Sequence, residues 1–226
     1  MSTSAPDALR DEWAALRERE PHLRIRHAAS EMGVSEAQLL ATRVGEGVRR
    51  LRADVATLLP RMEAVGRCMA LTRNDLFVHE KVGVYRNVYV DPHVASVVDE
   101  AIDLRIFPAR WRHAFAVEDD GPRGRRRSLQ FFDAHGVAVH KVFLKEDADV
   151  DVYEGIVAEL LHEDQSTAQE VAAPELAAGM KPDDAVDVAA LESDWRGMRN
   201  THDFHGLLRR HEVARTQALR LVADEL

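Results

Sequence analysis

Hydrophobic residues at the start of the chain recur every three to four positions, the spacing of one face of an α-helix. Over residues 7–20 this spacing predicts a helix that Asp7 can cap and Pro21 ends. Residues 25–44 predict two short helices around a Gly-Val-Ser turn, and residues 48–62 predict a further amphipathic helix. The chain is therefore expected to begin with a group of helices.

From residue 67 to residue 144 the pattern changes to short runs of β-branched and aromatic residues separated by turn signals. The predicted strands cover residues 67–72, 76–79, 84–90, 103–107, 112–118, 125–133 and 137–144. Residues 119–124 and 133–136 contain Asp and Gly, which is typical of hairpin connections. With a helix predicted over residues 150–162, the pattern indicates an α+β fold in which N-terminal helices lead into a meandering antiparallel β-sheet.

The chain changes character again after this helix. Residues 164–185 are rich in Ala, Glu, Gln, Asp and Pro and hold few large apolar side chains, which predicts a linker. Helical spacing then resumes over residues 186–226, and a faint internal repeat relates this segment to the N-terminal helices at a constant offset of 179 residues. The repeated residues are Val34, Gln38 and Leu40 in the first stretch and Val213, Gln217 and Leu219 in the second. Both stretches are expected to form the second helix of a helical pair.

The composition restricts the function. The chain has 226 residues, 46% hydrophobic and 31% charged, which is typical of a globular protein with a sizeable core. Its formal net charge of −9 disfavours general binding to nucleic acid. Cys68 is the single cysteine, which excludes an intramolecular disulfide and favours a reducing compartment. With no signal-peptide pattern and no apolar run of about 20 residues, we expect a soluble cytoplasmic protein that does not insert into membranes.

Three stretches of the sequence point to a family. They are residues 195–210 (WRGMRNTHDFHGLLRR), residues 103–107 (DLRIF) and residues 128–133 (SLQFFD). Together they resemble the bacterial hemin-degrading factor family (HemS/ChuS-like), whose members are cytoplasmic haem carriers and haem-degrading proteins. The resemblance covers essentially the whole chain but only about the first half of a typical member. It implies that residues 1–163 form one HemS/ChuX-like repeat, and that residues 186–226 are the helical start of an incomplete second repeat.

The resemblance also implies that haem is the ligand, and it indicates which residues bind it. Haem binding needs an axial donor, an apolar surface for the macrocycle and cations for the propionates. His202 matches the histidine that ligates the iron in the family, and Arg105 matches the distal arginine, the catalytic residue if haem is degraded. Phe107 follows Arg105 on the same strand face and is a candidate for contact with the ring. Arg215 matches a second arginine near the haem and is expected to pair with a propionate.

One position departs from the family pattern. His205 stands where the family commonly has an aromatic residue beside the ligand. His202 and His205 are three residues apart and so share one helical face. His205 is therefore an alternative axial ligand, one of a pair with His202 that binds a divalent metal, or a replacement for the aromatic residue at the rim of the site. His211 is expected to be solvated, and His140, in a predicted strand, is expected to be structural.

This resemblance implies a haem-binding protein of bacterial haem uptake and iron acquisition, which holds haem for transfer or for oxidative degradation resembling that of a haem oxygenase. The partners expected besides haem are an inner-membrane haem transporter or a haem oxygenase. A homodimer is a further expectation, because a second copy could replace the cover that the second sheet provides in the family.

Two other interpretations remain open from the sequence. Residues 28–39 resemble a helix-turn-helix, and residues 17–52 carry a mild local excess of positive charge, which would suit a DNA-binding regulator. The acidic charge of the whole chain argues against it. Alternatively, the chain is a truncated, non-functional remnant, in which residues 1–163 are stable and residues 164–226 are readily proteolysed.

Overall fold

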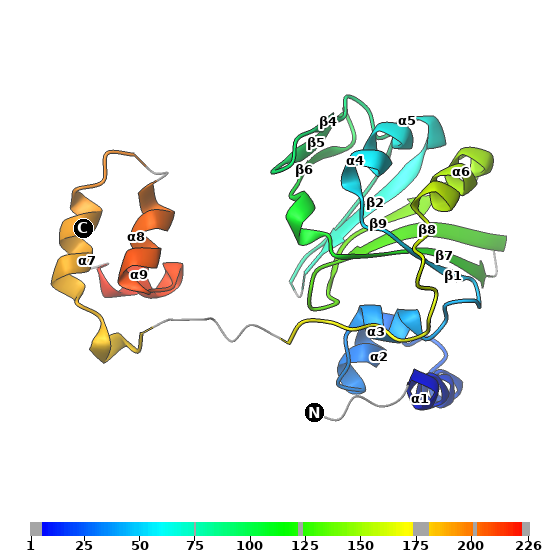
Figure 1. The fold of residues 1–226 in the computed structure, drawn as a ribbon, viewed down its shortest axis with the longest axis horizontal. Helices are drawn as coiled ribbons and strands as arrows, with labels where there is room; N and C mark the ends of the chain where they lie inside the picture. The colour runs from blue at the N-terminus through cyan, green and yellow to red at the C-terminus, as the bar shows by residue number, and fades with distance from the viewer. Residues whose placement is uncertain (1–5, 75, 122–123, 174–180, 201–202, 223–226) are drawn as a thin grey trace. The chain divides into compact units, whose positions relative to one another are not determined.

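The structure, a computed structural model, describes residues 6–74, 76–121, 124–173, 181–200 and 203–222. The chain divides into two compact units, Met1–Ala173 and Pro174–Leu226, and each unit is described by itself (Figure 1). The N-terminal unit contains helices and antiparallel strands, as the sequence predicts, and has an α+β fold.

The first three helices confirm the helical spacing at the start of the chain. They are α1 (Pro6–Arg19), α2 (Ile25–Glu31) and α3 (Glu36–Ala41). The hydroxyl of Ser35 accepts a hydrogen bond from the Gln38 backbone N–H, and the Gln38 side chain accepts one from the Ser35 backbone N–H. This reciprocal pair satisfies backbone donors that have no partner inside the helix, and it sets where α3 begins.

The predicted helix over residues 48–62 is wrong in its first third. Val48–Leu51 forms strand β1, which pairs antiparallel with a central strand of the sheet. Helix then follows in three short pieces, α4 (Val55–Leu58), η1 (Leu59–Arg61) and α5 (Met62–Val65). A short apolar run is compatible with both helix and strand. Here Val48–Leu51 is a strand because it pairs with the free edge of a long hairpin.

Six strands form the main sheet. Besides β1 they are β2 (Cys68–Arg73), β3 (Val78–Gly83), β7 (His113–Gly121), β8 (Gly124–Phe132) and β9 (Ala138–Leu144). The spatial order is β1-β7-β8-β9-β2-β3, with every neighbouring pair antiparallel. The predicted hairpin connections after β7 and β8 are confirmed, because β7–β8 and β8–β9 pair directly.

A second, smaller sheet has three strands, β4 (Tyr89–Val90), β5 (Ala95–Val98) and β6 (Asp103–Ile106), in that order. The sequence pattern did not predict β5. A short 3-10 turn, η2 (Pro108–Arg110), then leads toward β7. The inward side chains of this sheet, among them Ala95, Val97 and Ile106, are buried in the same hydrophobic cluster as α4, α5 and the main sheet. The small sheet is thus supported from behind by the core.

The two faces of the main sheet are covered by different helices (Figure 1). One face packs against α4, α5, the small sheet and α6 (Val150–Leu160), which Asp149 caps through the Val152 backbone N–H. The other face packs against α3, whose Ala37, Leu40 and Ala41 are buried. Alternating strand residues fill both layers, as expected for a sheet that is buried on two sides.

Residues 164–173, part of the predicted linker, run along the outer edge of β1 and belong to the N-terminal unit. The amide side chain of Gln165 accepts from the backbone N–H of Arg50 at 3.0 Å and donates to its carbonyl at 2.9 Å. The Arg50 guanidinium is buried and donates to the carbonyls of Ser166 and Ala168, and burial lowers its pKa. The Gln165 bonds satisfy the backbone N–H and carbonyl of Arg50 at the edge of β1, as a further strand would.

The C-terminal unit consists, in its described part, of a 3-10 turn and three helices. They are η3 (Asp183–Ala185), α7 (Val188–Arg196), α8 (Phe204–His211) and α9 (Arg215–Leu221). Its small core contains Leu191, Leu207, Val213 and Ala218. Among the residues that the structure describes, in either unit, no helix is long and apolar enough to cross a membrane.

Candidate functional site

Two of the predicted site residues lie on the outward face of the small sheet. Arg105 is on β6, and Phe107 follows one residue after the strand in extended backbone, so both side chains lie on the same face. Arg105 is exposed, and the Phe107 side chain is 55% exposed. An exposed cation next to an exposed aromatic ring on a supported sheet is a surface that can bind a flat anionic ligand.

The strand register adds two residues to this face that sequence analysis did not single out. Ser96 of β5 pairs with Arg105 of β6, and Tyr89 of β4 pairs with Ser96. Tyr89, Ser96 and Arg105 therefore form one row across the sheet, with their side chains on the same face as Phe107. The Tyr89 side chain is 60% exposed. Tyr89 lies in a predicted strand, so the sequence could have indicated an aromatic contact there. Its place in one row with Ser96 and Arg105 could not be predicted, because the sequence pattern did not predict β5.

In the C-terminal unit the aromatic residues of the family motif pack together. Trp195 of α7 and Phe204 of α8 meet edge to face with ring centroids 4.7 Å apart, and Met198 packs against the same cluster. This contact joins α7 to α8 and fixes the start of α8. His202, the predicted axial ligand, lies outside the residues that the structure describes. Its role stays a prediction.

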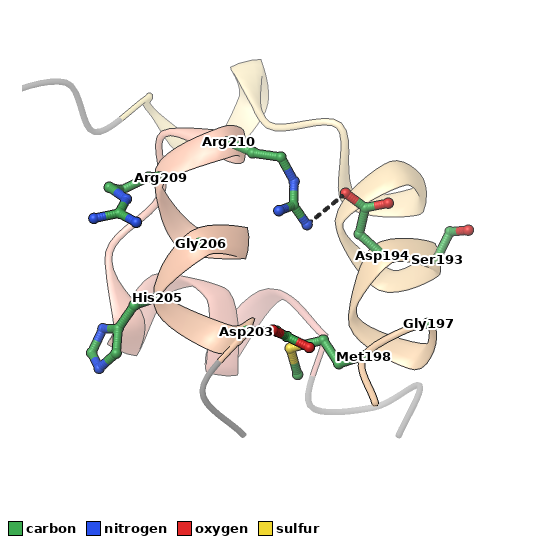
Figure 2. A pocket seen from close by; sticks show the side chains of 9 residues that line it. All are labelled: Ser193, Asp194, Gly197, Met198, Asp203, His205, Gly206, Arg209 and Arg210. Carbon is green, nitrogen blue, oxygen red and sulfur yellow. Dashed lines mark hydrogen bonds and ion pairs between the residues drawn. The ribbon is translucent and has the colours of Figure 1, made fainter. Parts of the chain in front are cut away.

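His205 lies in the first turn of α8 and is exposed. It lines a shallow pocket between α7 and α8 (Figure 2). Figure 2 shows Arg210 extending from α8 toward Asp194 of α7, whereas His205 and Arg209 extend from the other side of α8. His205 and Arg209 are one helical turn apart, so an imidazole and a guanidinium are exposed on one helix face.

The other side of the pocket is occupied by ion pairs. The Asp194 carboxylate accepts from His211 Nε2 at 2.9 Å and lies 3.4 Å from Arg210 Nη2. The hydrogen bond from His211, with the nearby Arg210 charge, lowers the pKa of Asp194. The prediction that His211 is solvated is wrong, because its side chain is only 14% exposed. His211 connects α7 to α8, a role that sequence spacing could not reveal.

Arg215, the predicted propionate partner, is the first residue of α9 and is exposed. The C-terminal unit thus presents His205 and Arg215 at its surface, while the N-terminal unit presents Arg105 and Phe107. Within the described residues of both units, no group of three or more His, Cys, Asp or Glu side chains could hold a bare metal ion.

His140 is buried in the N-terminal unit. Its Nδ1 lies 3.0 Å from Thr72 Oγ1 and its Nε2 lies 2.8 Å from the hydroxyl of Tyr85. The Trp111 ring stacks on the imidazole with centroids 5.7 Å apart. Burial lowers the pKa of His140 to about 4, so the ring is neutral near pH 7. With both nitrogens hydrogen-bonded inside the core, His140 has a structural role, as predicted.

The candidate helix-turn-helix does not have the geometry for reading DNA. A recognition helix must present one free face to the major groove. In α3, however, every residue except Gln38 is buried, and Glu36 forms a buried ion pair with Lys141 of β9. The remaining side chain, Gln38, is used in the cap of its own helix. The structure therefore does not favour the DNA-binding interpretation.

The fold and the sequence together place the chain in a known class of domain. The haemin-degrading HemS.ChuX domain matches residues 33–160, and the chain belongs to this family. It is 36% identical over 222 residues to the hemin transport protein HmuS of Yersinia pestis, covering 97% of this chain and 63% of that protein. It is also 36% identical over 204 residues to the hemin transport protein HemS of Yersinia enterocolitica.

Solved structures agree with this assignment. Holo-PhuS, a heme-binding protein from Pseudomonas aeruginosa, is 44% identical with a TM-score of 0.82, over 96% of this chain and 63% of that one. ChuS, a heme-degrading enzyme of Escherichia coli O157:H7, is 30% identical with a TM-score of 0.78, over 98% of this chain and 64% of that one. The chain therefore spans less than two thirds of the length of these relatives. ChuX, at 14% identity and a TM-score of 0.54, shares the fold over 64% of this chain.

Proposed function

We propose that this chain is a haem-binding protein of bacterial haem uptake and iron acquisition, which holds haem for transfer or for oxidative degradation. The observation that supports this most is the 44% identity to a heme-binding protein over 96% of the chain. In this proposal His202 is the axial ligand of the iron, with His205 as the alternative. Arg105 and Phe107 contact the distal side of the haem, and Arg215 pairs with a propionate.

The chemistry of the described residues fits haem better than a bare metal ion. The macrocycle itself supplies four nitrogen ligands, so the protein needs to add only one imidazole. A bare ion would need several side chains, and no such group is found in the described parts of the chain. Arg105 and Phe107 supply the two further requirements, a permanent cation and an exposed aromatic contact.

A hemin titration followed by visible absorption tests the proposal. Wild type should give a saturable shift of the Soret band, and His202→Ala should lose or alter that shift. His22→Ala is the matched control, because His22 is an exposed histidine of the N-terminal unit outside the family motif. An unchanged spectrum in His202→Ala, together with loss in His205→Ala, would transfer the ligand role to His205. Non-saturable binding by wild type would contradict the proposal and favour the remnant interpretation.

A second measurement separates transfer from degradation. Addition of a reductant under air should leave the Soret band in place if the chain is a carrier, and should remove it if haem is consumed. In the second case Arg105→Ala should slow the loss while leaving the ferric spectrum of the complex intact. We further propose a cytoplasmic location, with an inner-membrane haem transporter or a haem oxygenase as partner. Light scattering at several concentrations would test a homodimer.

A further inference from the structure

We infer that Tyr89 is a further haem-binding residue, which extends the surface assigned to Arg105 and Phe107 across the outward face of the β4-β5-β6 sheet. This outer face consists of Tyr89, Ser96, Val98, Asp103, Arg105 and Phe107. The inference rests on the proposed function and assigns it a surface and one further binding residue.

Register places Tyr89 in the same row as Arg105. The pairs Tyr89–Ser96 and Ser96–Arg105 put the two large side chains two strands apart, about 10 Å at the usual strand spacing. Phe107, the first residue after β6, lies about 7 Å along the extended backbone from Arg105 on the same face. Ser96, which lies between Tyr89 and Arg105, has a small side chain. Two aromatic rings and a guanidinium around a small side chain can contact a flat ring at several points.

The exposure of these side chains is unusual for the positions they occupy. Tyr89, Phe107 and Val98 are 60%, 55% and 50% exposed, whereas the inward Ala95 and Val97 of the same sheet are fully buried. A small sheet with one buried face commonly carries polar residues on its other face. A group of exposed apolar side chains on one face indicates a binding surface.

The backbone under Tyr89 is held in place. The Val98 N–H donates to the Arg86 carbonyl at 3.1 Å, and the Asn87 side-chain amide donates to the Val98 carbonyl at 2.8 Å. Asn87 has a positive φ of 49°, a conformation that asparagine tolerates better than most residues. These contacts fix the segment before β4 against β5, so the backbone that carries Tyr89 loses little conformational freedom when a ligand binds.

Charge orients the ligand on this face. Arg105 supplies a positive charge, while Asp103, on the same face, lies two residues away from it on the side opposite Phe107. A macrocycle is therefore expected over Phe107, Ser96 and Tyr89, on the side of Arg105 that lies away from Asp103, with its carboxylates directed away from that aspartate.

The test uses the full chain with two probes, hemin and iron-free protoporphyrin IX. Absorption follows hemin, and fluorescence anisotropy follows protoporphyrin. Tyr89→Ala should weaken both affinities by about three- to tenfold, the effect of losing one aromatic contact. Tyr89→Phe should stay within about twofold of wild type, because the ring rather than the hydroxyl makes the contact. The matched control is Phe77→Ala, which removes an aromatic side chain that is 70% exposed outside the outer face.

The outcomes distinguish this inference from the proposed function. His202→Ala should change the hemin spectrum but not protoporphyrin affinity, because protoporphyrin has no iron to ligate. If wild type binds hemin and Tyr89→Ala binds both probes as wild type does, the inference is overturned while the proposed function stands. An equal loss in Phe77→Ala would show adsorption to exposed aromatic residues and would also overturn it. If wild type binds neither probe, both fail.

Discussion

The helix pair α2–α3 of the N-terminal unit and the pair α8–α9 of the C-terminal unit turn their corners in the same way. Gly33 after α2 and Glu212 after α8 both have a positive φ, 66° and 55°, and they are separated by the offset of the sequence repeat. The next residue then bonds back to the preceding helix, Val34 to the Ala29 carbonyl and Val213 to the Leu208 carbonyl. Both corners use a left-handed residue to end one helix.

The second helix of each pair also begins in the same way. The Gln38 side chain accepts from the Ser35 backbone N–H at 3.0 Å, and the Gln217 side chain accepts from the Ala214 backbone N–H at 3.2 Å. A glutamine at the third helical position thus satisfies a free backbone donor in both units. The faint repeat predicted from sequence corresponds to a real structural repeat of the corner.

The surroundings of the two corners differ, however. Leu40 of α3 is 2% exposed, while its counterpart Leu219 of α9 is 45% exposed. Ala37 is buried against the sheet, while its counterpart Thr216 is exposed. The local sequence builds the same corner twice, but only in the N-terminal unit do the described residues include a sheet that buries the second helix. Residues close in sequence therefore determine the geometry of the corner, whereas packing against a sheet determines whether the second helix is buried in a core.

The largest expected difference lies in the matched leucines. Leu40→Ala should destabilise the N-terminal unit by about 2–5 kcal/mol, because it leaves a cavity under the sheet. Leu219→Ala should change the C-terminal unit by less than about 0.5 kcal/mol, because its side chain is half exposed. Urea unfolding followed by ¹⁹F NMR of fluorotryptophan resolves the units, since Trp13 and Trp111 report on one and Trp195 on the other. Equal losses in the two variants would contradict the comparison.

A pH titration compares the buried His140 with the ion pair of Asp194 and His211. The folded-state pKa of His140 is about 4, below the ordinary value of about 6.5, so the unfolded chain binds the proton more tightly. Stability that is complete above about pH 6.5 should therefore be lost as pH falls toward 4, by up to about 3 kcal/mol. The Trp111 resonance should report this loss before that of Trp195, because the hydrogen bond from His211 lowers the pKa of Asp194 and keeps this carboxylate ionised into more acid solution.

His140→Gln is the control for this titration. It should lower the stability of the N-terminal unit at neutral pH, because Thr72 and Tyr85 lose their present partner. It should also flatten the pH dependence between 6.5 and 4. An unchanged slope in this variant would assign the acid loss to other groups.

The two capping glutamines should differ by a smaller amount. Gln217 also donates to the Lys181 carbonyl at 2.7 Å and to the Asp183 carboxylate at 2.9 Å, contacts that tie the start of the C-terminal unit to α9. Gln217→Ala is expected to cost about 1 kcal/mol or more, and Gln38→Ala about half of that. Hydrogen exchange of the backbone amides in α3 and α9 measures both. A larger effect in α3 would reverse the expected order.

The smallest expected effects concern the left-handed residues. Gly33→Ala should destabilise α2–α3 by about 1 kcal/mol through backbone strain alone, because nothing lies within 4 Å of the added Cβ. Glu212→Gly should stabilise α8–α9 by a few tenths of a kcal/mol, because glycine relieves the strain but has more freedom in the unfolded chain. Opposite signs in the two units are the expected result, and thermal unfolding of each variant checks it.

Several parts of the fold could be predicted because they depend on residues close in sequence. The helices α1 to α3, the cap at Ser35 and the hairpins after β7 and β8 follow from spacing, capping chemistry and turn residues. The shared face of Arg105 and Phe107 also followed from the two-residue period of a strand. The family resemblance rested on motifs that are likewise local, and the comparisons confirm it.

Other features were decided only by the tertiary structure, because they depend on which distant segments pair. The edge of β7 makes Val48–Leu51 a strand, although its apolar pattern also fits a helix. The register of β4, β5 and β6 places Tyr89 in one row with Ser96 and Arg105. The approach of α7 to α8 pairs His211 with Asp194. Local sequence thus determined the helices, the turns and the alternation of faces along each strand. Burial and strand register determined which side chains meet, because both depend on contacts between distant segments.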